Sequence, residues 1–129
     1  MKRSIFILAL CGSMLSCQEK NDNALIGKWQ LVEQLIDIGD GSGSFVPTET
    51  GKTVEFREDG TVVSSGSLCG MGGQPGQQGA GAYSVETGEI TPDNCPTGQL
   101  PVKFELQDGE LILYYPCIEA CGEKYRKSR

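Results

Sequence analysis

Residues 100–115 read LPVKFELQDGELILYY, and this stretch decides the fold. Its first half alternates apolar and polar side chains, with Val102, Phe104 and Leu106 on one face. Asp108-Gly109 then supplies the positive φ angles that a tight hairpin turn requires, and a second apolar run follows the turn. A period of two around an Asp-Gly turn is typical of an antiparallel β-hairpin, so we expect two paired strands here.

The same pattern recurs along the chain. Glu58-Asp59-Gly60 and Thr87-Gly88 predict two more hairpin turns, and no amphipathic segment of helical length is evident. The expected strands are Leu25–Ile36, Thr53–Arg57, Thr61–Ser65, Gly81–Glu86, Glu89–Thr91, Leu100–Leu106, Glu110–Tyr115 and Gly122–Lys127. We therefore predict an all-β fold, a small eight-stranded up-and-down antiparallel barrel, because closure removes exposed sheet edges. A two-sheet sandwich is the alternative.

Alternation also predicts which side chains face the barrel interior. The expected inward set is Trp29, Leu31, Leu35, Val54, Phe56, Val63, Tyr83, Val85, Val102, Phe104, Leu106, Leu111, Leu113 and Tyr115. Glu33 falls on the same face as Trp29 and Leu31, where an unpaired carboxylate would be costly without a partner, water or ligand. A bulge after Leu31 would instead turn Glu33 outward, and the sequence leaves both possibilities open.

The first residues carry a targeting signal. Lys2 and Arg3 precede an apolar run from Ile5 to Leu15 that is too short to span a bilayer as a helix. Met14-Leu15-Ser16-Cys17 resembles a bacterial lipoprotein cleavage site, which implies acylation of Cys17. We expect a signal peptide at 1–16, a lipidated cysteine with a polar tether at 17–24, and one domain at 25–129. The expected location is the outer membrane, either periplasmic or surface-exposed, with the lipid holding the protein to the membrane.

Four cysteines remain beyond the lipid site, namely Cys69, Cys95, Cys117 and Cys121. An even number in an exported domain predicts disulfides. We favour Cys69 with Cys95 and Cys117 with Cys121, the crossed pairings being the alternatives. The spacing lacks the two close Cys-x-x-Cys pairs of a four-thiolate zinc site, so we expect no metal.

Composition excludes several functional classes. The 129-residue chain has no histidine, which removes Ser/His/Asp and Cys/His catalytic sets. Its net charge is −6, against the clustered positive charge of nucleic-acid binders, so we expect no nucleic-acid partner. We recognise no set of nucleophile, base and metal, and we expect neither an enzyme nor a cofactor. Two glycine-rich segments, Ile38–Thr48 and Gly66–Gly81, are expected to be a flexible turn and a mobile flap anchored by Cys69.

Gly27-Lys28-Trp29, near the start of the first expected strand, resembles the Gly-x-Trp motif of the lipocalin family. More closely, the chain is similar to short lipocalin-like lipoproteins of the Bacteroidetes group. The resemblance implies that Gly27 bends the strand and Trp29 plugs the closed end of the barrel. It also implies a basic residue packed on the indole ring, for which Arg126 is the candidate and Lys124 the next.

The resemblance further implies a calyx for a small hydrophobic ligand. The candidate ligand-binding residues are Trp29, Glu33, Phe56, Tyr83 and Phe104. An eight-stranded barrel is the borderline size, either filled by its own side chains or open enough for one small molecule. The alternative is therefore a packed structural or interaction domain, an envelope accessory subunit or hydrolase inhibitor whose partner is a protein. A void inside the barrel would favour the first function, and a filled interior would favour the second.

Overall fold

A computed structural model of the chain describes residues 24–71 and 76–129. Cys17 and the predicted signal peptide lie outside the described residues. Within the described part the chain forms nine strands, which are β1 (Gly27–Ile36), β2 (Phe45–Pro47), β3 (Thr53–Phe56), β4 (Thr61–Ser64), β5 (Gly79–Ser84), β6 (Glu89–Pro92), β7 (Val102–Gln107), β8 (Glu110–Tyr114) and β9 (Cys121–Lys127).

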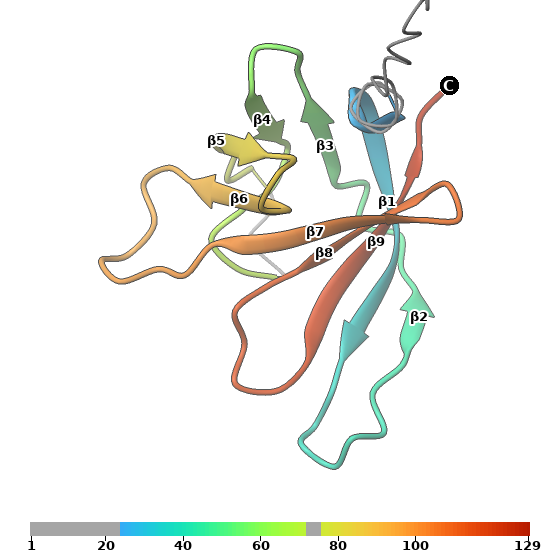
Figure 1. Cartoon of the computed structure of the whole chain (residues 1–129). Coiled ribbons are helices and arrows are strands. Elements are labelled where there is room, and N and C mark those ends of the chain that lie inside the picture. Colours follow the sequence, from blue (N-terminus) through green and yellow to red (C-terminus); the bar gives the residue numbers. More distant parts are fainter. Residues whose placement is uncertain (1–23, 72–75) are drawn as a thin grey trace, which may run out of the picture.

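The strands form a closed antiparallel barrel (Figure 1). From β3 to β9 each strand pairs with the next along the chain, and β1 pairs with both β3 and β9. These eight strands make the ring, as the sequence predicted. Closure leaves no long unpaired edge on the ring, which is the physical reason for this topology.

The three predicted hairpin turns are confirmed. Asp108 and Gly109 have φ angles of 53° and 79°, as a tight two-residue turn requires. At the turn between β3 and β4, Gly60 has a φ of 84°, and the Asp59 carboxylate accepts a hydrogen bond from the Thr61 N–H at 3.0 Å. Gly88 has a φ of 68° between β5 and β6.

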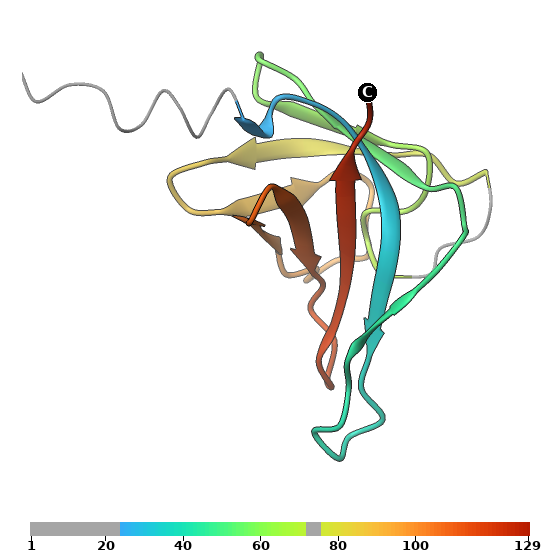
Figure 2. The ribbon, with the colours of Figure 1, turned by 90° about the vertical axis from the view of Figure 1, so that its right-hand side faces the viewer.

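Strand β2 lies outside the ring and was not predicted. It pairs with the second half of β1, where Leu35 stands opposite Phe45, within a segment that we expected to be only a flexible turn. The segment Phe45–Pro47 is too short to show an alternating pattern, and it ends in a proline, so the sequence did not predict a strand there. The pairing makes β1 and β2 a hairpin that extends past the ring, away from both described chain ends (Figure 2).

Apolar side chains fill the barrel. The buried core residues are Leu25, Trp29, Leu31, Val54, Phe56, Val62, Leu68, Ile90, Val102, Leu111, Leu113, Tyr115, Cys121 and Tyr125, and Met71, Tyr83 and Phe104 pack against them. Four residues of the predicted inward set, Leu35, Val63, Val85 and Leu106, are not part of the core. Leu35 faces outward because it stands opposite Gly122, the neighbour of the buried Glu123. Val62, not Val63, faces inward because it stands opposite the inward Phe56. Val85 and Leu106 are exposed.

The barrel has two unlike ends. The tryptophan end holds the start of β1, the end of β9 and the turns β3–β4, β5–β6 and β7–β8. The loop end holds the longer connections, among them residues 65–71 and 115–120, and both disulfides. Among the described residues, no helix is long and apolar enough to cross a membrane.

Candidate functional site

Three of the predicted ligand-binding aromatics contact one another. The centre of the Phe56 ring lies 5.0 Å from the centre of the Tyr83 ring and 5.5 Å from that of Phe104, and both contacts are edge-to-face. The Tyr83 hydroxyl donates to the backbone carbonyl of Arg57 at 2.6 Å. Trp29 belongs to the same buried core, and its indole N–H donates to the carbonyl of Leu25 at 2.9 Å. The structure thus brings these four residues into one packed cluster.

Glu33, the fifth candidate, lies on the outer face of the barrel. The register between β1 and β9 shifts between Leu31 and Glu33, which is the bulge left open by the sequence. Glu33 therefore stands opposite Lys124, and their side chains form an ion pair at 2.8 Å. Of the two possibilities that the sequence left open, the structure shows the outward one, because the extra residue, Val32, reverses the alternation. Gln34 takes the inward position instead, opposite Glu123.

The partner of the tryptophan is Lys127. Its ammonium lies 5.2 Å from the centre of the Trp29 ring and donates to the carbonyl of Ala24 at 2.8 Å. Trp29 stands opposite Lys127 in the pairing of β1 with β9, so both face the same way. The prediction of Arg126 as this partner was wrong by one residue. It faces outward and pairs with Glu110 at 3.0 Å.

Gly27 has a φ of 127°, a conformation that side chains other than glycine rarely adopt. A Cβ atom at this position would also come 3.0 Å from the Lys127 side chain. The glycine therefore lets the chain bend sharply into β1 and leaves room for the lysine that covers Trp29. Backbone, lysine and indole together close the tryptophan end.

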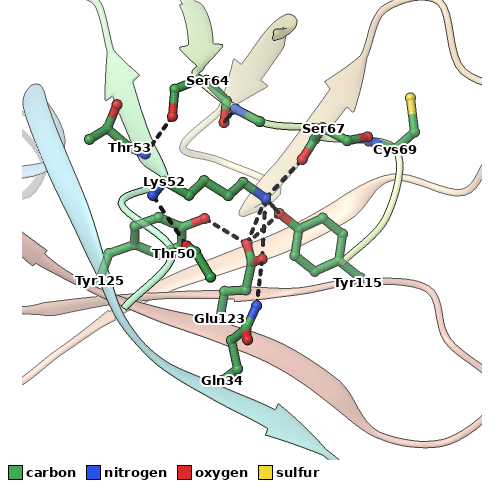
Figure 3. A network of polar contacts seen from close by, with 12 residues as sticks. Gln34, Thr50, Lys52, Thr53, Ser64, Ser67, Cys69, Tyr115, Glu123 and Tyr125 are labelled. Atoms are coloured by element: carbon green, nitrogen blue, oxygen red, sulfur yellow. Dashed lines mark hydrogen bonds and ion pairs between the residues drawn. The ribbon is translucent and has the colours of Figure 1, made fainter. Parts of the chain in front are cut away.

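At the loop end the interior holds a charged network that the sequence analysis did not find (Figure 3). Its centre is Glu123 on β9, whose side chain is 0% exposed. The ammonium of Lys52, just before β3, lies 3.0 Å from one carboxylate oxygen of Glu123 and 3.2 Å from the other. The hydroxyls of Tyr115 and Tyr125 donate to the same carboxylate at 2.7 and 2.6 Å.

The network is fully paired. Lys52 also donates to the carbonyl of Ser67 at 2.8 Å and to the Tyr115 hydroxyl at 3.1 Å, and Gln34 reaches Glu123 at 3.5 Å. Among the described residues, no buried side-chain nitrogen or oxygen lacks a hydrogen-bond partner. Complete pairing is what allows a charge to remain inside an apolar barrel.

Burial and the nearby carboxylate change the acidity of the two tyrosines. Desolvation raises the pKa of Tyr115 well above its ordinary value of 10.0, and the negative charge of Glu123 raises it further. The pKa of Tyr125 is raised in the same way, first by burial and then by the neighbouring Tyr115 and Glu123. Both phenols therefore remain hydrogen-bond donors at neutral pH and hold the carboxylate in place.

Residues 65–71 cover this network at the loop end, where the carbonyl of Ser67 accepts from Lys52. Leu68 is buried in the core, and Met71 packs against it, so this part of the predicted mobile flap is ordered by burial of its own apolar side chains. Gly79 passes so close that a Cβ there would meet the carbonyl of Gly66 at 2.8 Å. The amide of Gln99 donates to the carbonyl of Cys69 at 2.9 Å. The segment acts as a fixed plug over the loop end.

Disulfides fix the same end of the barrel. The structure pairs Cys69 with Cys95 and Cys117 with Cys121, which is the pairing favoured from the sequence. The first disulfide ties the plug to the connection after β6, and the second closes the connection between β8 and β9.

A small molecule would find little room beside the core residues. The side chains of Val54, Val62, Ile90, Val102, Leu111, Leu113 and Tyr125 are all 0% exposed. A void that admits water would expose the side chains bordering it, so no such void borders these seven. Three hollows lined by described residues, of about 460, 540 and 470 Å³, are open at the surface. Within the described part of the chain, no group of three or more Cys, Asp or Glu could hold a metal ion.

Comparisons with known proteins give one solved structure. The chain is 21% identical to an uncharacterized protein from Bacteroides eggerthii, with a TM-score of 0.49, and the match covers 81% of this chain and 99% of that one. No protein-family model matches the chain, and no curated protein matches it.

Proposed function

We propose that this protein is an exported lipoprotein whose filled barrel presents its loops to a protein partner in the cell envelope, and that it is not a carrier of a small hydrophobic ligand. The observation that carries the proposal is the filled interior. Aromatic and aliphatic side chains occupy the tryptophan end and the middle, and the paired Lys52 and Glu123 with their tyrosines occupy the loop end.

Energetics favour the same conclusion. A ligand at the loop end of the barrel would have to displace Leu68 or the charged network. Displacing the network would leave a charge without its partner in a dry environment, at a cost of about 3–5 kcal/mol. The rings of Phe56, Tyr83 and Phe104 already contact one another edge to face, and Phe56 is almost fully buried.

The proposed anchor follows from the sequence around Cys17. Small and apolar residues precede this cysteine, and polar residues follow it directly. Labelling cells with an alkyne fatty acid tests it. Cys17→Ala is expected to abolish both the label and membrane association, whereas Cys11→Ala, the matched control within the same leader, retains both. Label that survives Cys17→Ala would overturn the anchor.

Native mass spectrometry tests the filled barrel. Residues 18–129 are exported behind a cleavable secretory signal, purified without detergent and weighed before and after organic extraction. We expect one mass, lighter than the reduced chain by the four hydrogens of two disulfides. We expect no uptake from a panel of fatty acids and sterols.

Phe56→Ala provides the positive control, because it opens an apolar cavity beside Tyr83 and Phe104 that an added small aromatic such as benzene can enter. A hydrophobic molecule retained by the unmodified protein and released by extraction would overturn the proposal.

A further inference from the structure

Four large aliphatic side chains are exposed at the far end of the molecule. Ile36, Ile38, Val46 and Ile118 are 62%, 83%, 54% and 103% exposed, and we call these four residues the distal tip. They lie on the β1–β2 hairpin and on the connection between β8 and β9. Large apolar side chains that are exposed together at one end of a domain commonly mark a contact surface.

The two parts of the distal tip are fixed side by side. The N–H of Asp37 donates to the carbonyl of Ala120 at 3.1 Å, and Ile36 stands opposite Cys121 in the pairing of β1 with β9. The Cys117–Cys121 disulfide closes the turn that carries Ile118. Both ribbon views place the β1–β2 hairpin beside the β8–β9 connection (Figures 1 and 2). A surface held in this way loses little conformational entropy when a partner binds.

Acidic side chains accompany the distal tip. The carboxylate of Asp37 accepts hydrogen bonds from the N–H groups of Gly39, Gly41 and Gly43, which lower its pKa. Glu119 lies against the β1–β2 loop, since a Cβ on Gly39 would come 3.1 Å from its carboxylate oxygen. Within residues 24–71 and 76–129, the ion pairs do not involve Asp37, Asp40 or Glu119. The surface thus combines apolar contacts with uncompensated negative charge.

The distal tip lies opposite the start of the described chain. Ala24 is at the tryptophan end, where its carbonyl accepts from Lys127. Only residues 18–23 separate it from Cys17, a tether that reaches about 25 Å at full extension. A lipid on Cys17 would therefore hold the tryptophan end near the membrane and direct the distal tip away from it.

Charge decides among the occupants of this surface. A second copy of the chain would bring the same carboxylates against their equivalents, and an anionic membrane would repel them. A partner whose apolar cleft is bordered by lysine or arginine would match both properties of the surface.

We propose that the distal tip is the docking surface for an exported protein partner that has an apolar cleft with a basic border, and that Ile38 and Ile118 enter this cleft. The inference rests on the proposed function, because it names the surface and the kind of partner that an interaction domain would use. Ile118 is the natural anchor, since a fully exposed side chain gains most by burial.

Site-specific photocrosslinking in cells that make the full chain tests the proposal. A benzoylphenylalanine is placed at Ile38, at Ile118 or, as the matched control, at Val85 in the β5–β6 turn of the tryptophan end. The crosslinked protein is identified by mass spectrometry, purified and titrated against the wild-type chain and against Ile118→Asp. We expect crosslinks from Ile38 and Ile118 and not from Val85, and an affinity at least about tenfold weaker for Ile118→Asp.

Charge and folding are measured on the same partner. Binding is expected to weaken as salt rises and to weaken in Asp40→Asn with Glu119→Gln. Because Ile118 is fully exposed, Ile118→Asp is expected to unfold at the wild-type temperature, so lost binding is not lost folding.

Three results would overturn the inference. The first is a partner that binds Ile118→Asp as tightly as the wild-type chain. The second is crosslinking of the distal tip only to lipid or to a second copy of the chain. The third is crosslinking of the partner from Ile38 and Ile118 that is no stronger than its crosslinking from Val85. Partner crosslinks from Val85 alone would refute the distal tip while leaving the proposed function standing. Crosslinks from neither end, together with a hydrophobic molecule inside the barrel, would refute both.

Discussion

The tryptophan end and the loop end of this barrel are both closed, but by different chemistry. Trp29 closes one with an apolar ring, a backbone carbonyl and an outer lysine. Glu123 and Lys52 close the other with a buried ion pair under Leu68. When apolar atoms are removed from a core, the loss in the free energy of unfolding grows with the number of atoms removed. Removing either member of a buried ion pair causes a large loss at once, because the other charge is left buried without its partner. The loop end should therefore respond to mutation more abruptly than the tryptophan end.

Removing the central carboxylate should have the largest effect. Glu123→Leu leaves the Lys52 ammonium buried without its counter-charge, and we expect the free energy of unfolding to fall by about 3–5 kcal/mol. Adding Lys52→Met should restore most of that loss, because the second change removes the unpaired charge. Urea denaturation followed by tryptophan fluorescence measures both variants.

The exposed pair of Glu33 and Lys124 is the matched control. Glu33→Gln should cost less than about 1 kcal/mol, as surface ion pairs do. Equal losses for Glu33→Gln and Glu123→Leu would contradict the burial of the network.

Removing either disulfide of the loop end should also lower the free energy of unfolding. Cys69 and Cys95 are 26 residues apart, and replacing both by serine should cost about 3.5 kcal/mol from the released chain entropy. Cys117 and Cys121 are 4 residues apart, which gives about 2 kcal/mol by the same relation. Thermal and urea unfolding of the two double variants would give the order, and a reversed order would show that the plug is held mainly by Leu68.

Alkaline pH should act selectively on the loop end. Below about pH 10 the folded and unfolded chains both keep the phenolic protons of Tyr115 and Tyr125, so their effect on stability does not change with pH. Above it the unfolded tyrosines ionise while the buried ones stay protonated, and the free energy of unfolding falls by up to about 1.4 kcal/mol per pH unit for each tyrosine.

Urea denaturation between pH 9 and 11.5 measures this slope. Tyr115→Phe with Tyr125→Phe should flatten it relative to wild type, whereas Tyr114→Phe, which removes a half-buried tyrosine of the outer face, should change it less. A folded protein whose tyrosines all ionise near pH 10, followed by ultraviolet absorbance, would contradict a closed loop end.

The smallest effect should come from the lysine over the indole. Lys127→Met removes a cation–π contact and a hydrogen bond at the surface, and we expect a loss of about 0.5–1 kcal/mol. Arg126→Met, one residue earlier and paired with Glu110 on the outer face, should cost less. If the order were reversed in thermal unfolding, Arg126 rather than Lys127 would support Trp29.

The turns and the barrel were predictable because their signals are local. Asp108-Gly109 and Gly60 determine turns within a few residues, and closure follows from the number of short strands. Register was harder to predict. Val62 and Val63 are identical side chains on opposite faces, and the pairing of Phe56 with Val62 decides between them.

The buried network was not found because its members are far apart in the sequence. Gln34, Lys52, Tyr115 and Glu123 come from four separate segments, and no short motif links them. One signal was present. Glu123 is two residues from Tyr125, so an inward Tyr125 places a carboxylate inside the barrel. Leu68 was missed for another reason, since a glycine-rich composition concealed one apolar side chain that enters the core.

The bulge in β1 decides which side chains of this strand enter the barrel. If Val32 were paired with Lys124 instead of bulging out of the register, Glu33 would stand opposite Glu123, and two carboxylates would share the interior. Deleting Val32 would straighten the strand and keep Glu33 opposite Lys124 and Gln34 opposite Glu123, because the extra residue has no partner on β9. Over evolutionary time, β1 can therefore lose this residue without bringing a second carboxylate to Glu123, although the strand would look shorter by one.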